Sequence, residues 1–175
     1  MRLPPTPIAG PLLVVVERAV DERGFFARTW CVDEFAAQGI AAPMVQSSLS
    51  YNRRRGTLRG LHFQRPPSTE GKLVRCVRGA IHDVVVDLRA DAPSYLQRFS
   101  VELSAANCRA LYIPPGLAHG FQTLADDTEV HYQMNGRHAP GLAAGFRWDD
   151  PAFGLAWPIN PPTVISGRDA AWPDA

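Results

Sequence analysis

Short stretches of alternating apolar and polar residues recur along the chain, separated by turns rich in Gly, Pro and Asn. This period of two predicts β-strands. We expect strands at residues 12–17, 44–50, 57–64, 72–79, 80–89, 98–103, 110–113, 119–124 and 129–134. One short helix is expected at residues 34–38, with Asp33 as its N-cap and Gly39 after its end. Many short strands with so little helix predict an all-β fold, an antiparallel sandwich or small barrel.

The stretch from residue 57 to residue 79 carries the most informative side chains. His62 and Lys72 lie ten residues apart on two expected strands that flank a turn, which predicts that these strands are neighbours. Lys72 is the only lysine, beside 17 arginines. Arginine serves sites that need only a positive charge, whereas a compact ammonium whose pKa can change is specific to lysine. Lys72 is therefore a candidate for chemistry.

The last expected strand places a tyrosine among apolar neighbours. Val130, Tyr132 and Met134 share one face, so an inward-facing strand makes Tyr132 a buried phenol. Histidine accepts a proton near neutral pH, lysine stabilises a negative oxygen, and tyrosine returns a proton from another side. Together, His62, Lys72 and Tyr132 predict proton abstraction next to a carbonyl group.

Length and charge narrow the possible classes of protein. At 175 residues the chain fits one domain, residues 1–175, whose C-terminal part lacks periodicity and is expected to wrap the sheets without joining them. The formal net charge of +1 creates no global field toward nucleic acid or an anionic membrane. The apolar run at residues 11–16 is too short for a signal peptide or a membrane span.

Two patterns argue against metal binding. The three cysteines are odd in number and lack Cys-x-x-Cys spacing, which disfavours a zinc site and a disulfide framework and suits a reducing cytoplasm. Residues 114–119 have the Pro-x-Gly-x-x-His form of the second motif of metal-binding cupins, but Phe63 and Gln64 follow His62 where the first motif needs His-x-His. One histidine with a distant second is a poor ligand set, so we expect no metal.

Five motifs carry a specific resemblance: Arg59–Gln64 (RGLHFQ), Gly71–Gly79 (GKLVRCVRG), Asp83–Asp87 (DVVVD), Ile113–Phe121 (IPPGLAHGF) and Arg147–Pro151 (RWDDP). In order and spacing they resemble the dTDP-4-dehydrorhamnose 3,5-epimerase family, from about residue 7 to about residue 173. The resemblance implies a jelly-roll cupin barrel with one or two short helices. It also implies a homodimer with swapped N-terminal strands and no cofactor. The implied substrate is a nucleotide sugar, dTDP-4-dehydro-6-deoxy-D-glucose, epimerised at C3 and C5 to dTDP-4-dehydro-L-rhamnose.

The same resemblance implies roles for single residues. His62 matches the base that takes the proton, and Asp169 matches the carboxylate that fixes its tautomer. Lys72 matches the group that stabilises the enolate oxygen, and Tyr132 the one that returns a proton to the opposite ring face. The positions that match substrate contacts are Gln46, Ser48, Arg59, His119 and His138, with Arg23 and Phe26 reaching into the neighbouring subunit's site.

The spacing of two of these residues demands an irregular strand. Arg59 and His62 are three residues apart, so a regular strand points them to opposite faces. Both can face the ligand only if the strand bulges or twists at Gly60. We predict that irregularity.

The chain also departs from the family's pattern. Ser47, Ser48 and Leu49 stand where the family usually carries Asp-x-His-type or Asn-containing residues, which predicts altered nucleotide contacts. His138 stands where a second tyrosine often lies against the sugar. These departures leave an alternative open, a mono-epimerase acting at C3 only or C5 only on a dTDP-4-keto-6-deoxysugar.

Two other classes make different predictions. A metal-dependent cupin oxygenase or isomerase would contain near-stoichiometric metal and lose activity to a chelator. A sugar-binding module would bind a dTDP-sugar and exchange no ring hydrogen. The complete set of His62, Lys72, Tyr132 and Asp169 favours the epimerase over both.

Overall fold

The computed structural model describes residues 1–41, 43–137 and 139–175. In chain order the strands are β1 (Leu12–Val14), β2 (Ala19–Asp21), β3 (Gly24–Phe26), β4 (Gln46–Asn52), β5 (Thr57–Gln64), β6 (Lys72–Arg78), β7 (Ala80–Asp87), β8 (Arg98–Ser104), β9 (Ala110–Ile113), β10 (Leu117–Thr123), β11 (Thr128–Met134), β12 (Ala143–Gly145) and β13 (Val164–Ile165). The helical segments are α1 (Val32–Ala36), the 3₁₀ turn η1 (Pro140–Leu142) and α2 (Gly167–Ala170).

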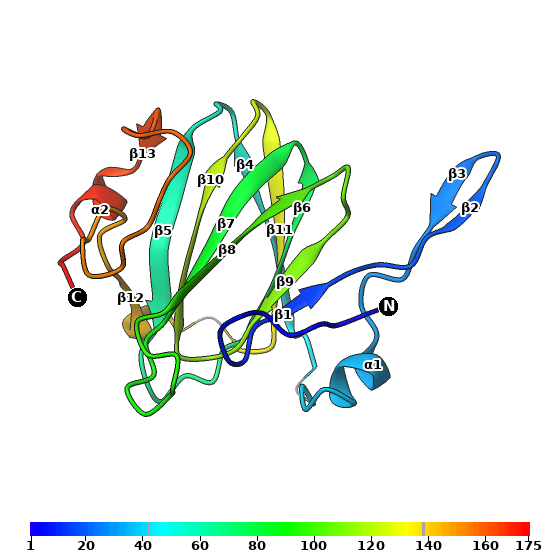
Figure 1. Cartoon of the computed structure of the whole chain (residues 1–175), viewed down its shortest axis with the longest axis horizontal. Coiled ribbons are helices and arrows are strands. Elements are labelled where there is room, and N and C mark those ends of the chain that lie inside the picture. Colours follow the sequence, from blue (N-terminus) through cyan, green and yellow to red (C-terminus); the bar gives the residue numbers. More distant parts are fainter. Residues whose placement is uncertain (42, 138) are drawn as a thin grey trace.

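Two sheets form the body of the molecule (Figure 1). The five-stranded sheet has the order β1-β9-β6-β11-β4, and the six-stranded sheet has the order β12-β5-β10-β7-β8 with β13 beside β5. Only β13 runs parallel to its partner; the other described pairs are antiparallel. The all-β class is confirmed. Among the described residues no strand pairing joins the two sheets, so the fold is a sandwich and not a closed barrel.

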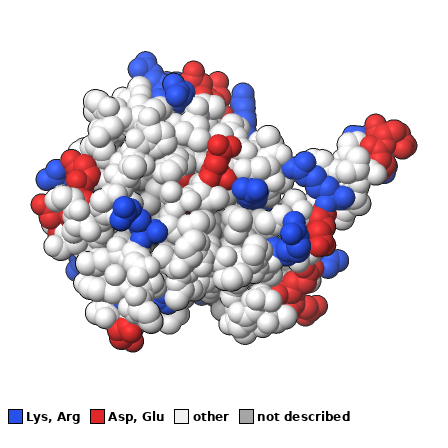
Figure 2. Space-filling model, in the orientation of Figure 1, with Lys and Arg blue, Asp and Glu red and all other residues white. Residues whose placement is uncertain are grey.

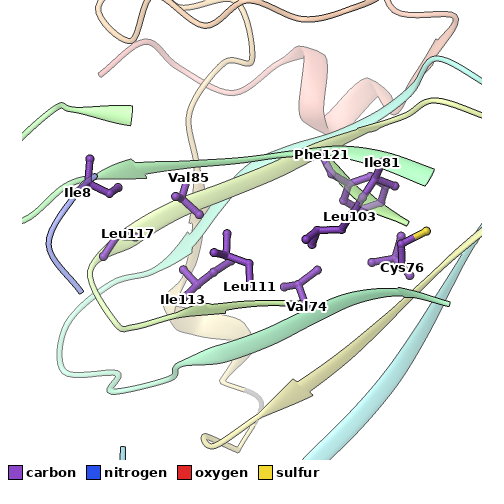
Figure 3. Packing of buried hydrophobic residues seen from close by; sticks show 11 residues of the cluster. Ile8, Val74, Cys76, Ile81, Val85, Leu103, Leu111, Ile113, Leu117 and Phe121 are labelled. Atoms are coloured by element: carbon purple, nitrogen blue, oxygen red, sulfur yellow. The ribbon is translucent and has the colours of Figure 1, made fainter. Parts of the chain in front are cut away.

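An apolar cluster fills part of the space between the sheets (Figure 3). On β7, Ile81 and Val85 point into this cluster, whereas Val84 and Val86 point to the opposite face. The alternation expected for residues 80–89 is therefore confirmed, because successive side chains of a strand lie on opposite faces. Burying each such side chain contributes about 1.5–3 kcal/mol. The fully buried members include Val74, Val85, Leu103, Leu111 and Val130.

The C-terminal part packs on the outer face of the six-stranded sheet. Phe153 and Trp157 join a second apolar cluster there with Leu58 and Leu61 of β5. The expectation that this part stays outside the sheets is wrong for two short segments, because β12 and β13 both pair with β5. Without them β5 would be an edge strand with unpaired backbone groups. Segments of three and two residues are too short to show a period in the sequence.

Helix α1 begins earlier than its sequence signals predict. Its N-cap residue is Cys31, whose side chain makes no capping hydrogen bond, so the prediction of Asp33 as N-cap is wrong. Phe35 is fully buried, and its ring lies 4.1 Å from that of Trp30 and 6.2 Å from that of Tyr112. Packing of one aromatic side chain places this short helix, since tertiary contacts supply most helical stability.

Strands β2 and β3 form a hairpin that projects from the body (Figure 1). All of its strand residues are exposed, including Val20 at 75% and Phe26 at 77%. The turn is closed by Asp21, whose Oδ1 accepts a hydrogen bond from the Arg23 backbone N–H at 2.9 Å. Figure 2 shows both signs of charge on this arm and on the visible face of the body, in keeping with the net charge of +1.

Candidate active site

Strand β5 is irregular where the sequence predicted it. His62 pairs in register with His119, and Arg59 pairs with Phe121, so β5 has one residue more than β10 between these pairs. Gly60 has a φ of +125°, and a Cβ on it would lie 2.5 Å from the Gly120 Cα. Only glycine fits this conformation and this close approach. The bulge turns both Arg59 and His62 toward one hollow between the sheets, which confirms the prediction.

His62 is hydrogen-bonded to a buried carboxylate. Its Nε2 lies 2.7 Å from Oδ1 of Asp169, and the Gly60 N–H donates to Oδ2 at 3.3 Å. Asp169 lies on α2, where its backbone N–H donates to the Ser166 hydroxyl that caps the helix. Burial raises the pKa of Asp169, but the His62 hydrogen bond and charge outweigh it, so the pKa is lower than usual. An Nε2–H donated to Asp169 leaves the lone pair of a neutral ring on Nδ1.

Lys72 lies across the hollow from His62. It begins β6 in the five-stranded sheet, whereas His62 belongs to β5 in the six-stranded sheet. The prediction that the two strands are neighbours is therefore wrong, because the chain between them crosses from one sheet to the other. Burial lowers the pKa of Lys72, and the carboxylate of Glu70, with Oε1 3.6 Å from Nζ, offsets part of that effect.

Tyr132 shares the wall that carries Lys72. On β11 it pairs in register with Val74, two residues from the pair of Met134 and Lys72. Burial raises the pKa of Tyr132 far above its usual value, the charge of Asp83 raises it further, and Arg59 acts in the opposite direction. The phenol therefore stays protonated at neutral pH and has a proton to give.

Buried polar partners hold the other two basic side chains of the hollow. His119 Nε2 lies 2.7 Å from Oδ1 of Asp83, which has no exposed surface. Arg59 Nε donates to Oδ1 of Asn52 at 2.7 Å. The His119 ring centroid lies 6.1 Å from that of Tyr132, edge to face. These contacts fix the side chains before any ligand binds, which lowers the entropic cost of binding.

Two adjoining hollows, of about 380 and 240 Å³, share His62, Lys72 and Tyr132 in their walls. Their sizes suit part of a small-molecule ligand each. Asp169 stands behind His62. The predicted site residues that line one or both hollows are Gln46, Ser48, Arg59, His62, Lys72, His119 and Tyr132.

Two predicted site residues lie away from these hollows within the described chain. Arg23 and Phe26 lie on the projecting hairpin, with the Arg23 side chain 82% exposed. Within the described chain they do not line either hollow. His138 lies outside the described residues.

The structure adds three residues to which the sequence reasoning gave no role. Asp83 had a detectable signal, because it shares a strand face with apolar Ile81 and Val85. Glu70 lies in the turn before β6, where no periodicity points to it. Arg168 lines the larger hollow from the tail, which the sequence placed outside the sheets.

A sequence model of the dTDP-4-dehydrorhamnose 3,5-epimerase family matches residues 5–175. This chain belongs to that family. The epimerase of this name from Sinorhizobium fredii is 40% identical over 166 residues, which cover 95% of this chain and 85% of the relative. A dTDP-4-dehydrorhamnose 3-epimerase from Streptomyces niveus is 38% identical over 170 residues, with 97% and 81% covered. The dTDP-4-dehydrorhamnose 3,5-epimerase from Bacillus anthracis, crystallised with TDP and PPi bound, has a TM-score of 0.95 at 35% identity over 99% of both chains.

Of the three β4 residues at which the sequence predicts altered nucleotide contacts, Ser47, Ser48 and Leu49, one faces the site. Ser48 lines the larger hollow. The Ser47 hydroxyl lies 2.7 Å from His131 Nε2 in an exposed pair, and Leu49 is 59% exposed. Alternate residues of a strand face opposite sides. Of these three residues, Ser48 is therefore the one that can alter ligand contacts within its own chain.

In the described part of this chain, no three His, Cys, Asp or Glu side chains gather closely enough to hold a metal ion. None of its described helices has the length and apolar character to cross a bilayer.

Proposed function

We propose that the chain epimerises dTDP-4-dehydro-6-deoxy-D-glucose at C3 and C5, giving dTDP-4-dehydro-L-rhamnose. The hydrogens on C3 and C5 lie next to the C4 ketone, so removal of either as a proton gives an enolate whose charge rests on the ketone oxygen. The observation that supports this proposal is the placement of His62 on one wall and of Lys72 and Tyr132 on the other, in a member of this family.

His62 is the base in this scheme. Nδ1 accepts the proton from carbon, and Asp169 stabilises the imidazolium that forms. The Lys72 ammonium stabilises the enolate oxygen. Tyr132 then donates its proton to the same carbon from the opposite wall, which inverts the configuration. Solvent restores the proton to Tyr132 and removes the one from His62.

We assign substrate contacts to the polar side chains around this centre. Every step above is a proton transfer between side chains, substrate and solvent, so the scheme calls for no metal or cofactor. The residues assigned to substrate binding are Gln46, Ser48, Arg59 and His119, which line the hollows, and, from the resemblance alone, His138.

A mono-epimerase is the second candidate function. The 3-epimerase from Streptomyces niveus is 38% identical to this chain, against 40% for the 3,5-epimerase from Sinorhizobium fredii, so identity does not separate the two activities. Two predicted departures from the family's pattern favour altered sugar binding. They are Ser48, which lines the larger hollow, and His138.

Turnover of dTDP-4-dehydro-6-deoxy-D-glucose in deuterium oxide tests both candidates. Each inversion takes its new hydrogen from solvent-exchanged groups, so a 3,5-epimerase should give product with deuterium at both C3 and C5. A mono-epimerase should give deuterium at one inverted carbon. Proton NMR of the product counts the labelled positions. If neither carbon acquires deuterium, the chain is not an epimerase of this substrate.

We also propose a homodimer in which Arg23 and Phe26 of each hairpin reach the partner's pocket. The hairpin exposes large apolar side chains far from its own site, and an isolated two-stranded hairpin is at best marginally stable in water. The outer face of the five-stranded sheet also exposes Leu49 at 59% and Val77 at 44%. A second copy that covers both surfaces would remove them from water.

Sedimentation equilibrium should therefore give twice the mass of one chain. Leu49→Asp should shift the equilibrium toward monomer, because it buries a charge in the proposed interface. Val164→Asp is the matched control, since Val164 is 41% exposed on β13, away from that face. A monomeric wild-type protein would contradict the dimer.

A cytoplasmic location, expected from the cysteine pattern, stays a prediction.

A further inference from the structure

Glu70 is the carboxylate nearest to the lysine of the site. Its Oε1 lies 3.6 Å from Lys72 Nζ, and its side chain is only 7% exposed. Glu70 and Lys72 together line the larger hollow and a small one beside it. The carboxylate therefore borders the space proposed for substrate.

The backbone around Glu70 is held in place by a neighbouring turn. The Gly71 N–H donates to Oδ1 of Asn135 at 2.6 Å, and the Asn135 N–H donates to the Gly71 carbonyl at 3.2 Å. A Cβ on Gly136 would lie 3.0 Å from the Glu70 Cβ, so the turn leaves just enough room for this side chain. The backbone and Cβ of Glu70 are thus placed by contacts other than that of its carboxylate with Lys72.

The other ionisable groups near Lys72 do not offset its burial. Asp83 and Asp169 stand behind His119 and His62, with which they form hydrogen bonds. Among the described residues that line the three hollows with Lys72, Glu70 is the one carboxylate. The remaining ionisable side chains in these walls are Arg59 and His62 on β5, His119 on β10, Tyr132 on β11 and Arg168 on α2.

We propose that Glu70 is a positioning residue, which holds the Lys72 ammonium at the pocket and keeps it charged once substrate covers the site. The inference rests on the proposed role of Lys72 in stabilising an enolate. Burial favours the neutral amine, and a neutral amine stabilises an oxyanion poorly. The Glu70 charge acts against this effect.

The single lysine allows a direct test. In trace labelling of the full-length protein with acetic anhydride across a range of pH, the peptide that contains residue 72 reports the unprotonated fraction of Lys72. Glu70→Gln keeps the size of the side chain and removes its charge, so the labelling midpoint should move down by about one pH unit. The alkaline fall in kcat should move down with it, because the ammonium is lost at lower pH, while KM changes less.

Two variants separate charge from packing. Glu70→Asp keeps the charge and should retain a midpoint closer to that of the wild type. Glu129→Gln is the matched control, since Glu129 pairs with the exposed Arg78 at 3.8 Å, and it should leave the midpoint unchanged. An unmoved midpoint in Glu70→Gln overturns the proposal. Labelling of Lys72 needs no substrate, so it tests the role of Glu70 separately from the reaction. Absence of substrate hydrogen exchange in the wild-type enzyme would instead overturn the proposed function.

Discussion

His62→Ala should slow hydrogen exchange at C3 and C5 of the substrate by about 10³-fold, because a positioned general base contributes on the order of 10²–10⁴-fold. Binding of dTDP should remain close to that of the wild type, because His62 acts on the sugar ring and nucleotide binding does not depend on it. Exchange is measured by NMR in deuterium oxide, and binding by calorimetry. The change removes the group that links Asp169 to the pocket and leaves the opposite wall intact.

A second histidine provides the control for this variant. His82 is partly buried on β7 and packs edge to face on Trp157 at 6.1 Å, on the outer side of the six-stranded sheet. His82→Ala should keep exchange near the wild-type rate even if it lowers the melting temperature. Substantial residual exchange in His62→Ala would remove His62 from the role of base.

Tyr132→Phe is expected to separate the two halves of the reaction. It removes one oxygen from the wall opposite His62, so the base can still take the proton, but no acid stands ready on the other face. Exchange of ring hydrogens should continue, while formation of inverted product falls by at least about 10²-fold. Deuterium incorporation into recovered substrate, compared with the yield of epimer, measures both quantities.

Another buried phenol controls for loss of a hydroxyl in general. Tyr112 lies on β9 of the same sheet, is 5% exposed, and belongs to the cluster around Phe35 instead of the pocket. Tyr112→Phe should invert substrate at nearly the wild-type rate. If Tyr132→Phe also retains both exchange and inversion, another group must be the donor.

Separation of the acid from the base across the sandwich is what the proposed inversion requires. A base and an acid on one strand face would remove and return the proton on the same side of the sugar. Here the bulge at Gly60 turns Arg59 and His62 inward on one sheet, and the pairing of β6 with β11 aligns Lys72 with Tyr132 on the other. The distance between the walls is set by side-chain packing, since stacked sheets lie about 10 Å apart.

Local sequence was sufficient to predict β1 and β4 to β11, but not the hairpin strands β2 and β3 or the short β12 and β13. It also predicted the inward or outward direction of many side chains. The alternation of inward and outward side chains along β7, and around Tyr132 on β11, depends only on the pleat of the chain, which repeats every two residues. The bulge was predicted from the resemblance and the spacing together, because the resemblance implies that Arg59 and His62 both face the ligand and their three-residue spacing conflicts with that in a regular pleat. The roles of single residues came from resemblance to a family, and they remain predictions.

What the sequence by itself determined is therefore the all-β class, the strand faces and the residue types available for proton transfer. Only the tertiary structure decided that Lys72 and His62 lie in opposite sheets, that the tail adds β12 and β13 to β5, and that Glu70 lies beside the one lysine. The physical reason is the separation along the sequence of the residues that determine each feature. A side chain's face follows from its immediate neighbours, whereas pairing of strands and burial of charge depend on segments that meet only when the two sheets pack together.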